Sequence, residues 1–265
     1  KQLLILSFLT NYLGINVAIA GALTTSILIF DILTDPIIGY LSDRTVSRWG
    51  RRAPWMAIGA LLLPLGQIGI FGVPNFASQM STLIWVTVFF AISTLGFTMV
   101  AIPYGASAGE MTYEPKERSS LMGFRMAFAS MGILIGGAII PQLAGGTKDG
   151  HFFASAVIAP VIIIAIWASL WATRKAPKET APSHASLRSM ALLVYQNKPF
   201  MRLVLLYGLM TMAIATITAG LPFAAIYLIF DGEASFLSAM SKNLGTLSFL
   251  FAAFVIGAMC SQIFW

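Results

Sequence analysis

Two aspartates, Asp31 and Asp35, lie within a strongly apolar stretch of the sequence. Because they are four residues apart, they would project from one face of a helix, about one turn from each other. An ionised carboxylate in the bilayer interior costs at least about 2.5 kcal/mol, so the pair must face a cavity, a cation or a proton. With the hydroxyl of Thr34, they supply oxygen ligands for a hard cation such as Na⁺, and a proton could also occupy the pair. The alternative is that both acids lie near a helix end and are simply solvated.

A dense group of arginines follows these acids in the segment GYLSDRTVSRWGRR. Its first residue, Gly39, allows a neighbouring helix to approach closely, and Asp43 can pair with an arginine or with a helix N-terminus. The other residues of interest in this segment are Arg44, Arg48, Gly50, Arg51 and Arg52. Arginine side chains at a helix end extend toward the membrane surface, so a basic loop that fixes topology is the simplest interpretation.

Other polar residues interrupt later apolar runs. Arg125 is the one arginine in the run over residues 119–143, and a cation within a membrane needs a partner or a polar substrate. Two roles stay open for it: an ion pair with Asp31 or Asp35, and a place in a substrate cavity. Thr98, taken alone, is an ordinary hydroxyl of the kind that packs between helices.

Aromatic and histidine residues give weaker indications. Tyr104, Phe97 and Trp85 could line a cavity for an apolar substrate, although aromatic residues at such spacing also pack between helices. We expect His151 to lie in an outer loop and His184 in a linker, both solvated. Neither histidine has an obvious place in a proton relay.

The sequence around these residues is that of a membrane protein. Of its 265 residues, 58% are hydrophobic and 10% are charged, whereas soluble domains have about 25% charged residues. Apolar runs of about 20 residues recur, each long enough to cross a bilayer as a helix. There is no nucleotide-binding glycine loop, zinc-ligand spacing or nucleophile motif, and Cys260 is the single cysteine. We therefore predict an all-α membrane protein that is not an enzyme and needs no cofactor.

Eight helical segments are expected, of which the first and last are partial. They cover residues 1–12, 17–41, 54–73, 82–106, 119–143, 153–172, 200–230 and 244–265. We divide the chain into a transmembrane bundle at 1–173, a linker at 174–199 and the start of a second bundle at 200–265, and we expect a longer protein beyond both ends. Within the linker, ASLRSMALLVYQ could form a short amphipathic helix on the membrane surface.

The basic residues are distributed unevenly between the two sides of the expected bundle. Twelve lie in or beside the loops of one side, and the opposite loops hold only Lys148 and Lys242. By the positive-inside rule, the arginine-rich side is cytoplasmic. This topology explains the net charge of +6 without a nucleic-acid partner, and we expect a multi-pass protein of the inner or plasma membrane.

Two segments together resemble a known family. The segments DILTDPIIGYLSDRTVSRWGRRAPW and IPYGASAGEMTYEPKERSSLMGFRMAF are similar to the glycoside-pentoside-hexuronide:cation symporters of the major facilitator superfamily. Gly39, Asp43, Arg44 and the Gly50-Arg51-Arg52 run match the superfamily's cytoplasmic loop signature. The resemblance implies the major facilitator fold, with a six-helix N-terminal bundle followed by the first helices of the C-terminal bundle.

The resemblance also implies a cation site and a substrate cavity. Asp31 and Asp35 match the family's cation-binding aspartates, Thr98 matches a threonine of the same site, and Thr34 stands where an asparagine is found. Arg125 matches an arginine that lines the substrate cavity. Ala101 and Gly105, however, replace an acid and a tryptophan of sugar-transporting members, so a sugar site does not carry over.

Our first hypothesis is a symporter that couples Na⁺ or H⁺ to the movement of a small solute, such as a sugar or glycoside, by alternating access. Asp31, Asp35, Thr34 and Thr98 would hold the cation, Arg125 and Tyr104 would line the substrate cavity, and the loop arginines with Asp43 would act as a gate. One alternative is a transporter-derived structural subunit that packs against other membrane proteins and transports nothing. Another is a lipid or pigment carrier of the same superfamily.

Overall fold

A computed structural model describes residues 5, 8–10, 12–112, 114–136, 140–145, 147–176 and 187–224. It divides the chain into two compact units, Lys1–Pro182 with Ala252–Trp265, and Ser183–Phe251. Every regular element among the described residues is helical, and this confirms the predicted all-α class.

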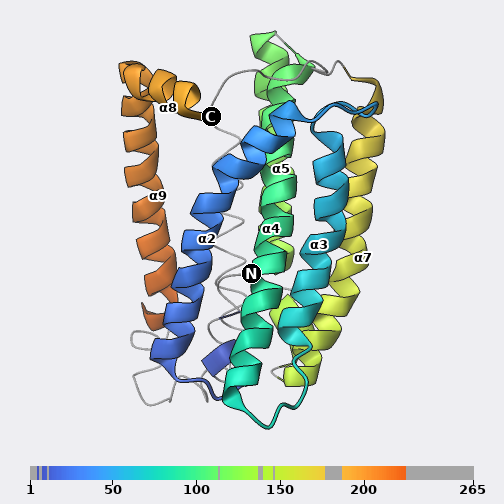
Figure 1. The fold of residues 1–265 in the computed structure, drawn as a ribbon, viewed down its shortest axis with the longest axis vertical. Helices are drawn as coiled ribbons and strands as arrows, with labels where there is room; N and C mark the ends of the chain where they lie inside the picture. The colour runs from blue at the N-terminus through green and yellow to red at the C-terminus, as the bar shows by residue number, and fades with distance from the viewer. Residues whose placement is uncertain are drawn as a thin grey trace. The chain divides into compact units, whose positions relative to one another are not determined.

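The first unit contains the helices that carry the predicted site (Figure 1). These elements are α2 (Val17–Arg44), α3 (Ala53–Phe71), α4 (Gln79–Met111), α5 (Pro115–Leu134), α6 (Ile140–Ala144), α7 (Lys148–Ala172) and the short 3₁₀ helix η2 (Thr173–Lys175). Three of these helices begin at a polar residue that caps the N-terminus. The side chains of Asn16, Ser78 and Thr147 accept hydrogen bonds from the first turns of α2, α4 and α7.

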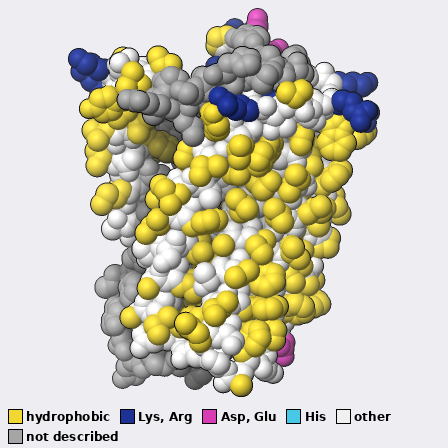
Figure 2. Space-filling model, viewed as in Figure 1, with side chains coloured by type: hydrophobic (Ala, Val, Ile, Leu, Met, Phe, Trp, Pro, Cys, Tyr) yellow, Lys and Arg dark blue, Asp and Glu magenta, His cyan; other side chains and the backbone are white. Residues whose placement is uncertain are grey.

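Four helices of the described chain are long and apolar enough to cross a membrane: Val17–Arg44, Ala53–Phe71, Gln79–Met111 and Lys148–Lys175. Hydrophobic side chains cover much of their outward faces, and Lys and Arg side chains gather near one end (Figure 2). The chain is therefore a multi-pass membrane protein.

The predicted helices agree with the structure at their centres and differ at their ends. The helix expected at 82–106 extends to Met111, and the helix expected at 17–41 extends to Arg44, so Asp43 and Arg44 are helical and not in the loop. The helix expected at 119–143 begins at Pro115 and its α-helical part ends at Leu134, followed by the separate α6. The first segment is described only at residues 5, 8–10 and 12, and the segment at 244–265 lies outside the described residues.

Close backbone packing joins α3 to α4, the most extensive contact between described helices. Gly59 and Gly66 on α3 leave no room for a side chain: a Cβ on Gly59 would lie 2.7 Å from the carbonyl oxygen of Gly96, and one on Gly66 would lie 2.6 Å from Ser93 Cα. Small residues of this kind let helices approach closely, and in a membrane, where no hydrophobic force draws helices together, such close packing holds them in contact. This packing gives α4 a fixed position, and α4 carries Thr98, Tyr104 and Glu110 of the site described below.

The second unit is described over α8 (Leu187–Gln196) and α9 (Lys198–Ala224). The short helix predicted in the linker is confirmed as α8, whose sequence is LRSMALLVYQ. Helix α9 covers most of the helix predicted at 200–230, whose last six residues lie outside the described chain.

Candidate functional site

The structure brings together residues from α2 and α4 at the predicted cation site. Thr98 on α4 is 1% exposed, and its hydroxyl donates to Oδ1 of Asp31 on α2 at 3.1 Å. Asp35 lies one turn further along the same face of α2, close enough to interact with both Asp31 and Thr98. Two carboxylates and a buried hydroxyl therefore meet between two apolar helices.

Thr34 lies on this face of α2 but is directed to its own helix. Its hydroxyl donates to the carbonyl oxygens of Phe30 at 2.9 Å and Asp31 at 3.1 Å. A hydroxyl that donates to the backbone keeps its oxygen lone pairs, so Thr34 can still offer a ligand to a cation. Because carboxylate and hydroxyl oxygens are the ligands of hard cations, the group can hold Na⁺, and its carboxylates can instead take up a proton.

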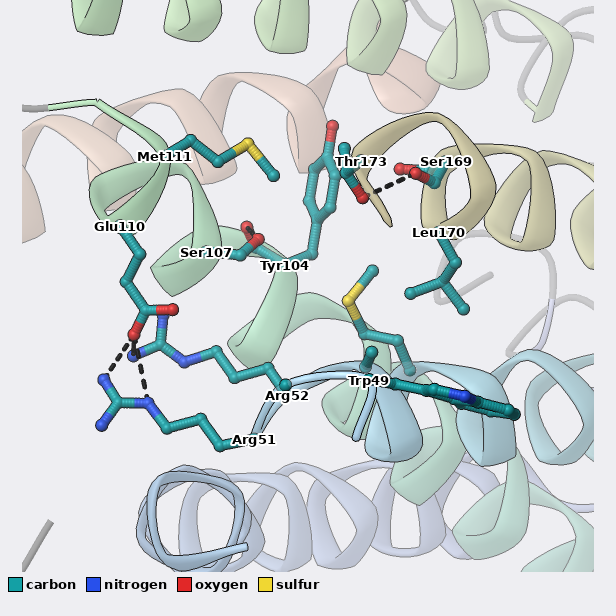
Figure 3. A pocket seen from close by; sticks show the side chains of 13 residues that line it. Trp49, Arg51, Arg52, Tyr104, Ser107, Glu110, Met111, Ser169, Leu170 and Thr173 are labelled. Atoms are coloured by element: carbon teal, nitrogen blue, oxygen red, sulfur yellow. Dashed lines mark hydrogen bonds and ion pairs between the residues drawn. The ribbon is translucent and has the colours of Figure 1, made fainter. Parts of the chain in front are cut away.

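An ionic cluster joins the α2–α3 segment to the end of α4 (Figure 3). Arg52 Nη2 lies 3.1 Å from Asp43 Oδ1 and 3.0 Å from Glu110 Oε1. Arg51 Nε donates to the same Glu110 oxygen at 3.1 Å, its Nη2 also contacts Glu110, and Asp43 Oδ1 lies 3.8 Å from Arg51 Nε. The four side chains are largely buried and carry two positive and two negative charges, so the cluster is neutral as a whole.

Glu110 was not predicted as a member of this cluster. It lies 59 residues from Arg51 in the sequence, and the helix of residues 82–106 was expected to end before it. One feature of the sequence could have indicated this pairing: Glu110 is an acid one turn beyond the predicted apolar helix, on the membrane side that carries the arginines. Such an acid finds a basic partner because an unpaired charge near the apolar zone is costly.

The other predicted loop residues have different roles. Gly39 packs against α4, since a Cβ there would lie 3.5 Å from Ile102 Cγ2. Gly50 has a φ of 90°, in the left-handed region that favours glycine, and this places the two following arginines after the turn. Arg44 lies over the ring of Tyr40 at 4.2 Å, and Arg48 is exposed. A hydrogen bond of 2.7 Å from Trp55 Nε1 to Thr45 Oγ1 further ties the segment to α3.

Arg125 and Tyr104, the residues predicted to line a substrate cavity, lie next to each other. The Arg125 guanidinium carbon is 5.5 Å from the centre of the Tyr104 ring, within the range of a cation–π interaction. No carboxylate of the described chain lies within ion-pair distance of Arg125, so the structure contains no pair with Asp31 or Asp35. Tyr104 lines a small pocket beside the ionic cluster, together with Arg51 and Arg52 (Figure 3).

A larger cavity of about 950 Å³ lies within the first unit and reaches Asp31. Phe97 is among its lining residues, whereas Arg125 and Tyr104 are not. Trp85 packs instead between Phe76 and Phe89. The predicted cation site thus adjoins a space large enough for a small solute.

The prediction that His151 is solvated is wrong. His151 lies in the first turn of α7, is 8% exposed and lines the large cavity. The rings of Phe8, Tyr12 and Phe71 surround it, with centroids 5.4, 4.7 and 5.8 Å away. The error arose because helix α7 begins five residues earlier than predicted, which moves His151 from a loop into packed structure. His184 lies outside the described residues.

The family model for "MFS/sugar transport protein" matches residues 2–263. The chain belongs to this family, a family of transporters and not of enzymes, and the resemblance noted in the sequence is confirmed. The helical bundle, the paired acids on α2 and the arginine segment after it are consistent with this membership.

Named relatives agree with the family. The chain is 28% identical over 200 residues to the inner membrane symporter YicJ of Escherichia coli, and the matched region covers 74% of the chain and 43% of the relative. It is 31% identical over 173 residues to the putative glycoside/cation symporter YagG of the same organism, covering 63% and 37%. It is 33% identical over 144 residues to the sodium-dependent lysophosphatidylcholine symporter 1-B of Danio rerio, covering 52% and 27%. The chain spans less than half the length of each of these relatives.

Proposed function

We propose that the full-length protein is a cation-coupled symporter that carries a small solute by alternating access. The observation that carries the proposal is the hydrogen bond from Thr98 to Asp31, because it gathers oxygen ligands from two apolar helices at one place. Asp31 and Asp35 hold the coupling cation, Na⁺ or H⁺, and Thr98 with Thr34 completes its ligands. Relatives named as symporters, including a glycoside/cation symporter, support coupled transport.

Coupling follows from the position of Asp31 at the wall of the large cavity. A cation can drive a conformational change only if it binds one state more tightly than the other. Because the carboxylate lies on α2 and the hydroxyl on α4, any movement between these helices changes the number of oxygens that reach the cation. The same movement reshapes the cavity beside them, and this links cation binding to solute binding.

The ionic cluster is the gate element of this mechanism. Its charges come from α2, from the segment before α3 and from the end of α4, so it is intact only while these elements remain together. By the positive-inside rule this end faces the cytoplasm, and the protein lies in the inner or plasma membrane. Its partners are the bilayer, the coupling cation and the transported solute.

The solute belongs to one of two classes. A sugar or glycoside is supported by the family description and by the relative YagG. A lipid is the second candidate, favoured by Ala101 in place of an acid of sugar-transporting members and by a relative named as a lysophosphatidylcholine symporter.

Calorimetric titration of Na⁺, and of protons across a range of pH, into the purified full-length protein tests the cation site. We expect saturable binding that is lost in Asp31→Asn and Asp35→Asn and weakened in Thr98→Val. Thr25→Val is the matched control, because Thr25 is an exposed threonine of α2 whose hydroxyl donates only to the backbone of Gly21. Unchanged binding in folded Asp31→Asn and Asp35→Asn protein would refute the cation site.

A further inference from the structure

The walls of the large cavity are mostly apolar. Among the aromatic side chains that line it are Phe71, Phe90, Phe97 and Phe128, contributed by α3, α4 and α5. Aliphatic residues of α2, α3 and α7 fill most of the remaining wall. A free sugar exposes hydroxyl groups on every side, and most of them would lose their hydrogen bonds with water against such a wall without gaining a partner. The wall therefore fits a solute with a substantial apolar part.

Few polar groups of the wall are free to bind a solute. The polar side chains that line the cavity are Thr24, Asp31, Gln67, Thr94, His151 and Ser155. The hydroxyls of Thr24 and Ser155 donate to carbonyl oxygens of their own helices, and Thr94 also has a partner. Asp31 accepts from Thr98 and is assigned to the cation. Gln67 and His151 remain, on α3 and α7.

The geometry of His151 determines what it offers to a solute. Its Nδ1 lies 2.7 Å from the carbonyl oxygen of Thr147. A carbonyl oxygen can only accept, so Nδ1 carries the proton, and in the neutral ring Nε2 has a free lone pair. No group of the described chain bonds to Nε2, although the side chain is 8% exposed and faces the cavity. Nε2 is thus a hydrogen-bond acceptor, on a largely buried residue, that a solute in the cavity can reach.

Gln67 is a second polar group of the cavity wall, and it is partly buried. It lies near the C-terminal end of the apolar helix α3, lines the same cavity and makes no hydrogen bond to another described residue. A primary amide can both donate and accept. It therefore suits a hydroxyl group, which also does both, and leaves the charged Asp31 to the cation.

We propose that the cavity binds a hydroxyl-bearing amphiphile, with a hydroxyl group donating to Nε2 of His151, a second polar contact to Gln67, and an apolar part against the phenylalanine-lined wall. The inference rests on the proposed function and specifies its substrate class. It assigns His151 as a specificity-determining residue and distinguishes the solute from both a free sugar and a fully apolar molecule.

A series of radiolabelled alkyl β-glucosides, from methyl to octyl, tests the apolar part of this proposal. Each is applied below its micellar concentration to full-length protein in nanodiscs, and bound ligand is measured after subtraction of empty nanodiscs. Burial of each added methylene is expected to tighten saturable binding about fourfold until the cavity is filled. Affinity that is independent of chain length would overturn the proposal, as would binding no greater than that of empty nanodiscs.

Two substitutions of His151 separate its ring nitrogens. The amide nitrogen of His151→Asn can replace Nδ1 toward Thr147 but nothing replaces Nε2, whereas His151→Gln places a polar group near the position of Nε2. We expect His151→Asn to weaken hexyl glucoside binding at least tenfold and His151→Gln to retain more of it. Equal binding by His151→Asn and the unmodified protein would overturn the role of Nε2.

Gln67→Met provides an independent variant of similar size in case both histidine variants fail to fold. We expect it to weaken hexyl glucoside binding several-fold, and an unchanged affinity would overturn the second contact. Calorimetric Na⁺ binding on the same samples separates this inference from the proposed function. Intact Na⁺ binding without glucoside binding refutes the amphiphile alone, while chain-length-dependent glucoside binding without cation binding supports the amphiphile and refutes cation coupling.

Discussion

The substitution Glu110→Gln tests the ionic cluster most directly. Glu110 accepts three contacts through one carboxylate oxygen: two from Arg51 and one from Arg52 Nη2 at 3.0 Å. Glutamine has the same shape and can still accept hydrogen bonds, but it carries no charge. After the change, the positive charges of the two arginines are balanced within the described cluster by one carboxylate, that of Asp43.

The expected loss of stability is about 2 kcal/mol. A hydrogen bond to a charged group contributes about 1.5–3 kcal/mol and a neutral one about 0.5–1.5 kcal/mol, so each of the three contacts loses about 1 kcal/mol. The Glu110 side chain is 18% exposed, which lets water replace part of what is lost and reduces the sum of about 3 kcal/mol. A change of 2 kcal/mol lowers the ratio of folded to unfolded protein about 30-fold.

Unfolding of the full-length protein in mixed micelles of increasing dodecyl sulfate content measures this loss. Glu114→Gln is the matched control, because Glu114 is exposed and its side chain caps no helix; we expect it to change stability by less than about 0.5 kcal/mol. A double-mutant cycle with Arg52→Gln should give a coupling of about 1 kcal/mol, since the two residues share a contact. Equal stability of the Glu110→Gln and Glu114→Gln proteins, or purely additive effects in the cycle, would refute the role assigned to Glu110.

Two further substitutions test the packing that positions the site, with the same unfolding assay. Gly66→Ala is expected to lower the free energy of unfolding by more than about 2 kcal/mol, because its Cβ would meet the backbone of Ser93. The control Gly21→Ala should leave stability unchanged or raise it, because nothing lies within 4 Å of the added carbon. Similar losses for both variants would contradict the close packing of α3 and α4. Trp55→Phe removes the donor to Thr45 Oγ1 and should cost about 1 kcal/mol, and an unchanged stability would show that this bond does not hold the segment.

The positions of the long helices could be predicted from the sequence because the membrane requires them. An apolar run of about 20 residues has few alternatives to a helix in lipid, and α2, α3, α4 and α7 lie where such runs indicated. Helix ends were less certain, since they depend on capping residues such as Ser78 and Thr147 that lie outside the runs.

Contacts between distant residues could not be predicted from spacing alone. The approach of Thr98 to Asp31 spans 67 residues, and only the family resemblance indicated it. The pairing of Glu110 with Arg51, and the burial of His151 among aromatic rings, depend on how helices pack. Periodicity shows which face of a helix is apolar but not which neighbour covers it. The partners of these residues were therefore identified only from the structure.

The arginines of the cluster also act before the protein has folded. A newly synthesised chain enters the membrane while its helices are still separate, and in the orientation proposed above the positive charges of Arg51 and Arg52 would then help to retain their loop on the cytoplasmic side. In the finished structure Asp43 and Glu110 neutralise them. In that orientation the same two side chains would first act as a topology signal during insertion, and in the folded protein they form the ion pairs that join α2, the segment before α3 and α4. A substitution such as Arg52→Gln would therefore alter both the yield of correctly inserted protein and the stability of what is inserted.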